Sequence, residues 1–244
     1  SRSRTPGLGP AFGKNSSTSR MIDSILDQYW GEYLLLLPDV ERPGCITILR
    51  DPSGAVPCVY STGPSGGFIT SDISLAVQAG LYRKNVAWEE IPYYLAYPHI
   101  RTGRTALKDV HELLPGSEIR FQHGELEIKQ AWSPWKWVAP ENRHRAACDA
   151  AADVGESIRR VIGAFAPVDE PILLELSGGL DSSIIAACLS ETGVHSTCQT
   201  LVTPVPGADE RLYAGLVARH FGFEIYADDL SVDHAAFDFQ VPVH

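Results

Sequence analysis

The residues with the clearest chemical potential form one short run, rich in glycine and serine, in the second half of the chain. Eight consecutive positions make it up: Leu176, Ser177, Gly178, Gly179, Leu180, Asp181, Ser182 and Ser183. Two adjacent glycines allow a sharp turn and a close approach of the backbone to a ligand, because neither has a Cβ atom. The serine hydroxyls can donate hydrogen bonds, and Asp181 offers a carboxylate that could hold Mg²⁺ against phosphate oxygens. The pattern predicts a loop that binds phosphate or pyrophosphate.

The flanking residues predict the elements that position this loop. Residues 171–174 form a short apolar run typical of a strand, and residues 184–189 have the composition of a helix. The loop amides would then lie at a helix N-terminus, where N–H groups lack partners within the helix and the dipole is positive. The spacing is neither that of a Walker A loop nor G-x-G-x-x-G. The simpler interpretation is a turn that caps an ordinary helix, but its place between a strand and a helix favours a nucleotide site.

The rest of the second half alternates strand and helix patterns, which predicts a parallel sheet. We expect strands at 196–202 and 223–227, and between them a helix at 208–220 closed by Gly222. The acidic pair Asp209 and Glu210 is interpreted as the start of that helix. Before the loop, residues 141–165 predict a long amphipathic helix with an apolar face made of Ala147, Ala151, Val154, Ile158 and Val161. Ligands of parallel sheets bind at the carboxyl ends of the strands, where residues 177–183 lie.

The first half contains strand, turn and helix patterns of mixed order. Residues 1–20 are rich in Ser, Arg, Gly and Pro and are interpreted as a loop or mobile segment. The remaining expectations are a helix from Met21, a buried strand at 33–37, a hairpin of 45–49 with 56–60, a strand at 67–72, a helix ending at Gly80, a helix at 88–95, and a strand pair of 118–121 with 125–132.

Composition excludes several classes of protein. The chain has 244 residues, a formal net charge of −10 and a pI near 5.2, which argues against binding to nucleic acid. The five cysteines show neither C-x-x-C pairs nor zinc spacing. We therefore expect each of them to be a small, buried, apolar side chain. No apolar run approaches the length of a membrane span and no secretory segment is evident, so we expect a cytoplasmic protein without a membrane partner.

The run S-G-G-x-D-S-S resembles the PP-loop of ATP pyrophosphatases. Motifs in the first half resemble the glutaminase-type domain of the asparagine synthetase family: W-G-E-Y, R-D-P-x-G-x-x-P-x-x-Y (50–60), F-I-T-S-D-I, E-L-L-P-G-S (112–117) and Trp132. The resemblance implies a mixed α/β and α+β chain. Residues 21–138 would form a partial Ntn-hydrolase-like α-β-β-α sandwich, and residues 141–244 the truncated first part of a PP-loop parallel-sheet synthetase domain, similar to adenine nucleotide α-hydrolases.

The resemblance also implies the ligands and the site. These are ATP on residues 176–183, Mg²⁺ on Asp181, and adenine at the end of the next strand, where Thr200 and Val202 are the matching candidates; catalytic residues stay unassigned. The family's N-terminal cysteine nucleophile and Asn-Gly-Glu stretch have no match, because residue 1 is serine and the first cysteine is Cys45. We therefore expect a glutaminase half that is inactive or not represented. The family's second acidic loop is also absent, so we expect either a fragment or a partly ordered chain.

Three functions follow from this resemblance. The first is a ligase that adenylates a carboxylate for attack by an amine, as a lasso-peptide macrolactam cyclase; the sequence Trp132-Ser133-Pro134-Trp135 is similar to those cyclases. Its partners would be a precursor peptide, or a small amino-acid substrate, together with a leader-peptide protease or leader-binding protein. The second is glutamine-hydrolysing asparagine synthetase or β-lactam synthetase. The third is a scaffold subunit without catalysis.

Overall fold

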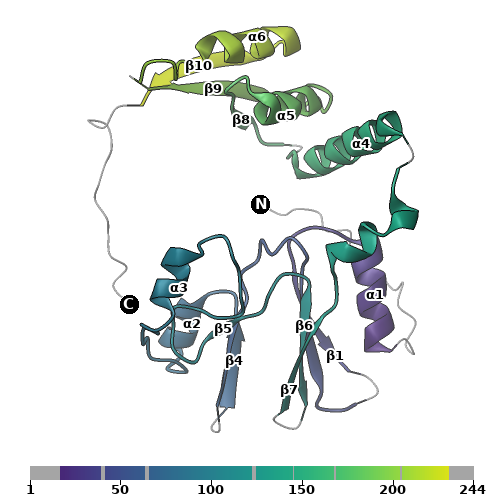
Figure 1. Cartoon of the computed structure of the whole chain (residues 1–244), viewed down its shortest axis with the longest axis vertical. Helices are drawn as coiled ribbons and strands as arrows, with labels where there is room; N and C mark the ends of the chain where they lie inside the picture. The colour runs from purple at the N-terminus through teal and green to yellow at the C-terminus, as the bar shows by residue number, and fades with distance from the viewer. Residues whose placement is uncertain are drawn as a thin grey trace. The chain divides into compact units, whose positions relative to one another are not determined.

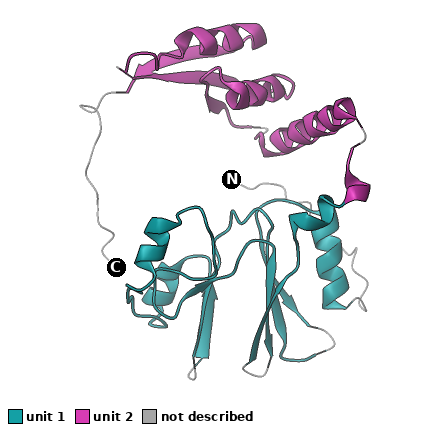
Figure 2. Cartoon of the chain, viewed as in Figure 1, with its two compact units in different colours: residues 1–139, 243–244 teal, residues 140–242 magenta. Residues whose placement is uncertain are grey.

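The computed structural model describes residues 17–39, 42–63, 66–122, 125–144, 146–167, 169–203 and 205–230. The chain divides into two compact units, one within residues 1–139 and the other within residues 140–242 (Figure 2). Helices and strands occur in both, so the expectation of a mixed α/β chain is confirmed. No described helix combines the length and the apolar character needed to cross a membrane.

The first unit has the layer order helix, sheet, sheet, helix (Figure 1). Helix α1, Thr18–Gln28, lies on a sheet with the antiparallel order β1-β2-β6-β7. The strands of this sheet are β1 Leu34–Pro38, β2 Ile46–Arg50, β6 Ser117–Gln122 and β7 Glu125–Gln130. The second sheet has the order β4-β3-β5, with β3 Val59–Gly63, β4 Gly66–Thr70 and β5 His111–Glu112. Helices α2, Ile73–Gln78, and α3, Ile91–Ala96, follow on the side of β4 and β5 (Figure 1).

Strand β2 supplies both cores of this unit, because neighbouring residues of a strand point to opposite faces. Leu49 packs with Ile22 and Ile25 under α1. Ile48, on the opposite face, packs in the cluster of Cys58, Tyr60, Leu113 and Ile119 between the two sheets. The expected pairing of residues 118–121 with 125–132 is confirmed by β6 and β7.

The expected hairpin of residues 45–49 with 56–60 is wrong. Strand β2 pairs with β1 and β6, whereas β3 pairs with β4 and β5 in the other sheet. The turn at 51–54 is therefore a corner between two sheets, and Arg50 holds it. The Arg50 side chain is 1% exposed, donates to the carbonyl oxygens of Val56 at 2.8 Å and Gly54 at 2.9 Å, and pairs with Glu112 at 2.8 Å. These Arg50 contacts stabilise the corner, so β2 and β3 separate into two sheets instead of pairing as a hairpin.

Three other expectations for the first unit need correction. Helix α1 begins at Thr18, so residues 18–20 are helical rather than loop, while residues 1–16 lie outside the described part. The segment 33–37 is an edge strand and not a buried one, since Leu36 is 64% exposed. The helix expected at 88–95 begins only at Ile91, after a turn, with Pro92 in its first turn.

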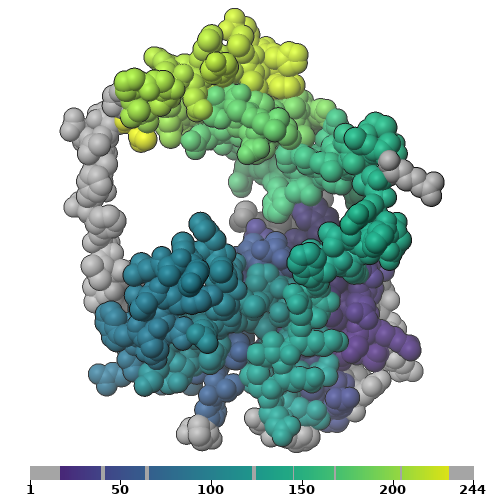
Figure 3. Space-filling model, viewed as in Figure 1, coloured from purple at the N-terminus to yellow at the C-terminus, as the bar shows by residue number. Residues whose placement is uncertain are grey.

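The second unit is a parallel three-stranded sheet with helices on one face. Its strands have the order β10-β9-β8, with β8 Ile172–Glu175, β9 Ser196–Val202 and β10 Glu224–Asp229, and both pairings are parallel as expected. The helices are α4 Ala147–Phe165, α5 Leu180–Ser190 and α6 Arg211–Phe221. Figure 3 shows the atoms of this unit, coloured from teal-green at α4 to yellow at β10.

The core of the second unit explains why the helices share one face of the sheet. Leu174, Leu176 and Cys198 point to that face and pack against the small residues Ala186 and Ala214 of α5 and α6. Residues of the opposite face are open, with Leu173 65% and Tyr226 58% exposed. As expected, α6 ends at Gly222, whose φ of +76° is in the left-handed region that glycine favours.

Two helices of this unit, α4 and α6, begin later than expected. Residues 140–142 form a short 3₁₀ helix and α4 begins at Ala147. The predicted apolar face of α4 is also wrong, because of its five residues only Ile158 is partly buried. Helix α4 reaches the core near its C-terminal end, through Ile162. The helix expected from residue 208 begins at Arg211, since the Asp209 carboxylate accepts a hydrogen bond from the Arg211 amide at 3.1 Å.

Candidate functional site

The glycine- and serine-rich run connects the end of β8 to the start of α5, as its flanks predicted. Leu176 is fully buried and its amide donates to the carbonyl oxygen of Gln199 at 2.8 Å, so the parallel ladder extends one residue past β8. The chain then turns through Ser177, Gly178 and Gly179, and α5 begins at Leu180. The loop therefore leaves a rigid sheet and enters a helix N-terminus within three residues.

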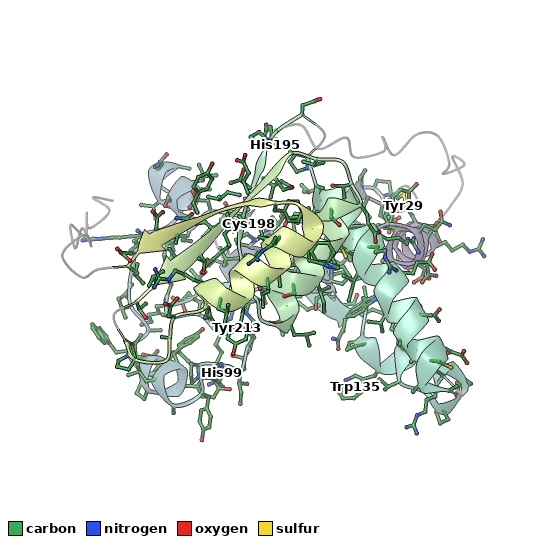
Figure 4. The ribbon with its side chains drawn as sticks, turned by 90° about the horizontal axis from the view of Figure 1, so that it is seen from above. Tyr29, His99, Trp135, His195, Cys198 and Tyr213 are labelled. Atoms are coloured by element: carbon green, nitrogen blue, oxygen red, sulfur yellow. The ribbon has the colours of Figure 1, made fainter. Side chains whose placement is uncertain are left out.

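Gly178 is required at its position for two independent reasons. Its φ of +77° is strained for other residues, and a Cβ atom there would lie 2.4 Å from the carbonyl carbon of Tyr213 and 2.5 Å from the amide nitrogen of Ala214. Tyr213 is in the first turn of α6 (Figure 4), so the loop packs directly on the backbone of that helix. Gly179 has an ordinary φ of −72°, and a Cβ there would meet only the Ser177 hydroxyl at 3.3 Å.

Most amides of the loop are open to a ligand. The Gly179 amide donates to Ser177 Oγ at 3.2 Å, and the Ser183 amide donates to the Gly179 carbonyl at 3.1 Å. The amides of Gly178, Leu180, Asp181 and Ser182 donate to no group in the described part of the chain. These N–H groups lie at the positive end of the α5 dipole, which suits an anion.

The side chains of the loop complete this donor set. The hydroxyl oxygens of Ser177 and Ser182 lie 3.0 Å apart and share a hydrogen bond. Asp181 is an exposed carboxylate in the first turn of α5. No group of three or more metal-ligating side chains occurs within the described residues, so a cation here would need ligands from a bound molecule as well as from Asp181.

A cavity of about 420 Å³ lies beside the loop, at the carboxyl ends of the strands. Three sets of residues line it: the end of β8, the end of β9 with the segment that precedes α6, and the residue after β10. They are Glu175, Leu176, Ser177, Thr200, Leu201, Thr203, Gly207, Ala208, Glu210 and Leu230. This is the edge at which ligands of parallel sheets bind.

The structure brings some of the predicted residues to this cavity and leaves others outside. Leu176, Ser177 and Thr200 line it, whereas Val202 and the loop residues 178–183 do not. Sequence reasoning missed the contribution of Gly207, Ala208, Glu210 and Leu230. The available signal was positional, because these residues follow the carboxyl end of a predicted strand or precede the next helix.

The two acids before α6 differ in their partners: the Asp209 carboxylate is hydrogen-bonded to Arg211, and the Glu210 carboxylate has no partner among the described residues. Hydrogen bonds from the Arg211 side chain and backbone lower the pKa of Asp209 to about 2. Glu210 is the N-cap of α6; its carbonyl accepts from the Ala214 amide at 3.0 Å, but its carboxylate has no partner within the described residues. At the end of β10, Asp228 accepts a hydrogen bond from Gln199 and lies outside the cavity lining.

The first unit shows no corresponding nucleophile in its described residues. Cys45 and Cys58 are buried, and burial raises the pKa of the Cys58 thiol to about 11, so it stays protonated near neutral pH. Ser1 lies outside the described part of the chain.

Comparison with protein families gives one match. The family model described as asparagine synthase matches residues 158–240, which include the loop, the cavity and all three parallel strands. This match supports the asparagine synthetase family. That family is one of ATP-dependent ligases, so the match supports an enzyme in general terms. No curated protein sequence matches this chain.

Proposed function

We propose that this protein is an ATP-dependent carbon–nitrogen ligase that activates a carboxylate as an adenylate with release of pyrophosphate. An amine then attacks the adenylate carbonyl, loses a proton and displaces AMP, which leaves an amide. The open amides of the loop carry the proposal. Four N–H groups at the start of α5 have no acceptor in the described chain, and Ser177, the first residue of the loop, lines a cavity at the carboxyl edge of the sheet. Triphosphate oxygens would accept these donors, and the nucleoside would enter the cavity.

The roles of the individual residues follow from their positions. Ser177 and Ser182 would donate to phosphate oxygens once their mutual hydrogen bond opens. Leu176 and Thr200 line the cavity and would contact the nucleoside, while Val202 would act only through the β9 backbone. Amides directed at the departing pyrophosphate would stabilise its developing charge.

Magnesium suits the chemistry of this loop. Mg²⁺ is commonly held by one or two carboxylates together with substrate phosphates, and Asp181 is an exposed carboxylate in the first turn of α5. We therefore assign Asp181 to Mg²⁺. When bound, the ion would neutralise phosphate charge and orient the triphosphate.

Among ligases of this kind we favour a lasso-peptide macrolactam cyclase, in which an Asp or Glu side chain of a precursor peptide is joined to its N-terminal amine. The sequence Trp132-Ser133-Pro134-Trp135 supports this choice by its similarity to those cyclases. In this protein Ser133 accepts from the Trp135 amide at 3.4 Å, and Trp135 is 77% exposed. A precursor peptide and a leader-binding protein or protease would be its partners, in the cytoplasm. The alternatives are asparagine synthetase, which carries the matched family's name, β-lactam synthetase, and a scaffold subunit.

Two measurements test the proposal. Calorimetric titration of the chain with ATP in the presence and absence of Mg²⁺ should show binding that is stronger with the ion. Exchange of labelled pyrophosphate into ATP should depend on the carboxylate substrate. Exchange that requires a peptide Asp or Glu supports the cyclase, whereas exchange with free aspartate supports asparagine synthetase. A chain that binds no ATP under either condition overturns the ligase assignment.

A further inference from the structure

The loop and the adjoining cavity have opposite hydrogen-bonding character. The loop presents N–H donors, whereas the ten residues that line the cavity include two glutamates, Glu175 and Glu210, and no Lys, Arg or His. A phosphate inside the cavity would meet carboxylates without a compensating cation, which is unfavourable at short range. An uncharged group that carries hydrogen-bond donors would be favoured there instead.

Part of the cavity lining is suited to a flat, mostly apolar group. Leu201 and Leu230 supply apolar surface, and Leu176, which also lines the cavity, is fully buried. Thr200 is 3% exposed, and its hydroxyl forms no hydrogen bond with another described residue. A ligand in the cavity could donate to this hydroxyl or accept from it. A nucleobase has the required combination of apolar faces and polar edges.

Glu210 differs from Thr200 because it is exposed at the cavity, and its carboxylate has no partner among the described residues. Its neighbour Asp209 lies outside the lining and is bound by the Arg211 guanidinium, with the Asp209 Oδ2 to Arg211 Nη2 distance at 2.6 Å. The two adjacent acids therefore have different tasks. Asp209 orders the start of α6, and the Glu210 carboxylate remains available to accept donors from a ligand.

We infer that Glu210 accepts hydrogen bonds from the vicinal hydroxyls of the nucleotide sugar, and so selects ribonucleotides. This inference rests on the proposed function, since it needs the phosphates on the loop and the base against the leucines. The sugar connects those two groups and would lie at the exposed part of the cavity. A carboxylate offers two acceptor oxygens, which match two neighbouring hydroxyl donors.

The test compares ATP with its 2′-deoxy and 3′-deoxy analogues by calorimetric titration. For the unaltered protein we expect each analogue to bind about 10-fold more weakly, as for the loss of a hydrogen bond to a charged group. In Glu210→Gln, ATP itself should weaken by about 10-fold and the discrimination against the analogues should shrink. Asp209→Asn is the matched control and should retain both ATP affinity and discrimination.

The outcomes separate this inference from the proposed function. If ATP binds but the analogues bind equally well, and Glu210→Gln changes nothing, the sugar assignment is overturned while the ATP site stands. If Glu210→Gln alters preference between ATP and ITP without altering preference for the sugar, the carboxylate contacts the base amine and the assignment is again overturned. If no nucleotide binds to the unaltered protein, both fail. The analogue comparison needs no variant, so it holds even if Glu210→Gln is poorly folded.

Discussion

Two turns of this protein share the residue types Asp, Ser and Gly, yet they do opposite things with their amides. In the turn at 51–54, the Gly54 amide donates to both the carbonyl and the carboxylate of Asp51, and the Ala55 amide donates to Ser53 Oγ. In the loop at 177–183, one amide is bound by Ser177 Oγ and four have no acceptor among the described residues. The Gly54 and Ala55 amides have acceptors within the first turn, whereas the second turn has donors to offer.

The difference arises from what surrounds each turn. The Arg50 guanidinium binds the carbonyl oxygens of the first turn and connects it to Glu112 in the other sheet. The second turn lies between the end of a parallel strand and a helix N-terminus, where orphan N–H groups are unavoidable. Residue composition therefore does not define an anion site; the number of unsatisfied amides does.

The largest effect on stability should come from replacing Arg50, which binds the turn at 51–54 through its guanidinium group. Arg50→Met would leave Glu112 and several buried carbonyls without their donor, so we expect the free energy of unfolding of the first unit to fall by about 3–5 kcal/mol. Urea unfolding followed by circular dichroism measures it. The control is Arg101→Met, an exposed arginine, which should change stability by less than about 0.5 kcal/mol. Equal effects of both variants would contradict the claim that the Arg50 hydrogen bonds stabilise the first unit.

Substitution of the two glycines with positive φ, Gly54 and Gly178, should affect different properties: stability in one case and ATP affinity in the other. Gly178→Ala forces the loop away from α6, and a displacement near 1 Å at a binding site can cost about 100-fold, so we expect a loss of that order in ATP affinity. Gly54→Ala, at φ +68° and with Pro115 Cγ at 2.5 Å, should destabilise the first unit and leave ATP affinity unchanged. Calorimetry and urea unfolding on both variants measure the contrast. Gly179→Ala should cost less affinity than Gly178→Ala; the reverse order would refute the contact argument.

A smaller effect is expected for the serine that shapes the open loop. Ser177→Ala removes the acceptor of the Gly179 amide and the partner of Ser182, so we expect ATP affinity to fall about 5-fold, the typical value of one neutral hydrogen bond. The control is Ser190→Ala at the other end of α5, where the hydroxyl only binds the Ala187 carbonyl. An unchanged affinity in Ser177→Ala would show that the hydroxyl pair has no part in binding.

The smallest effect is the pH dependence of the stability of the first unit, which we attribute to Cys58 in its core. Burial raises the pKa of Cys58 to about 11 from an ordinary value of 9.0. The Cys58 thiol keeps its proton to higher pH in the native state than in the unfolded state. Its contribution to the free energy of unfolding is therefore complete below pH 9 and is lost as pH rises towards 11. The urea midpoint of the first unit should fall between pH 8 and pH 10.5, and fall less in Cys58→Ala. Cys148→Ala, at an exposed cysteine, should behave like the unaltered protein.

Local patterns located the loop and its flanking elements because the relevant forces act over a few residues. The apolar run before Ser177, the two glycines and the small-residue helix after them predicted β8, the turn and α5. Parallel pairing followed from the alternation of strands and helices. Helix starts were less well predicted: α6 begins at Arg211 because the Asp209 side chain captures its amide, a choice that residue types alone do not reveal.

The amino-acid sequence by itself determined which residues carry chemistry: a glycine turn with hydroxyls and one carboxylate at a helix N-terminus, which is a matter of spacing along the chain. Tertiary structure decided what those residues meet. Only the fold puts Gly178 against the backbone of Tyr213, brings Thr200 and Glu210 to one cavity, and sends β2 and β3 into different sheets through Arg50. These contacts join residues far apart in the chain, and their energies depend on distance in space rather than on order in sequence.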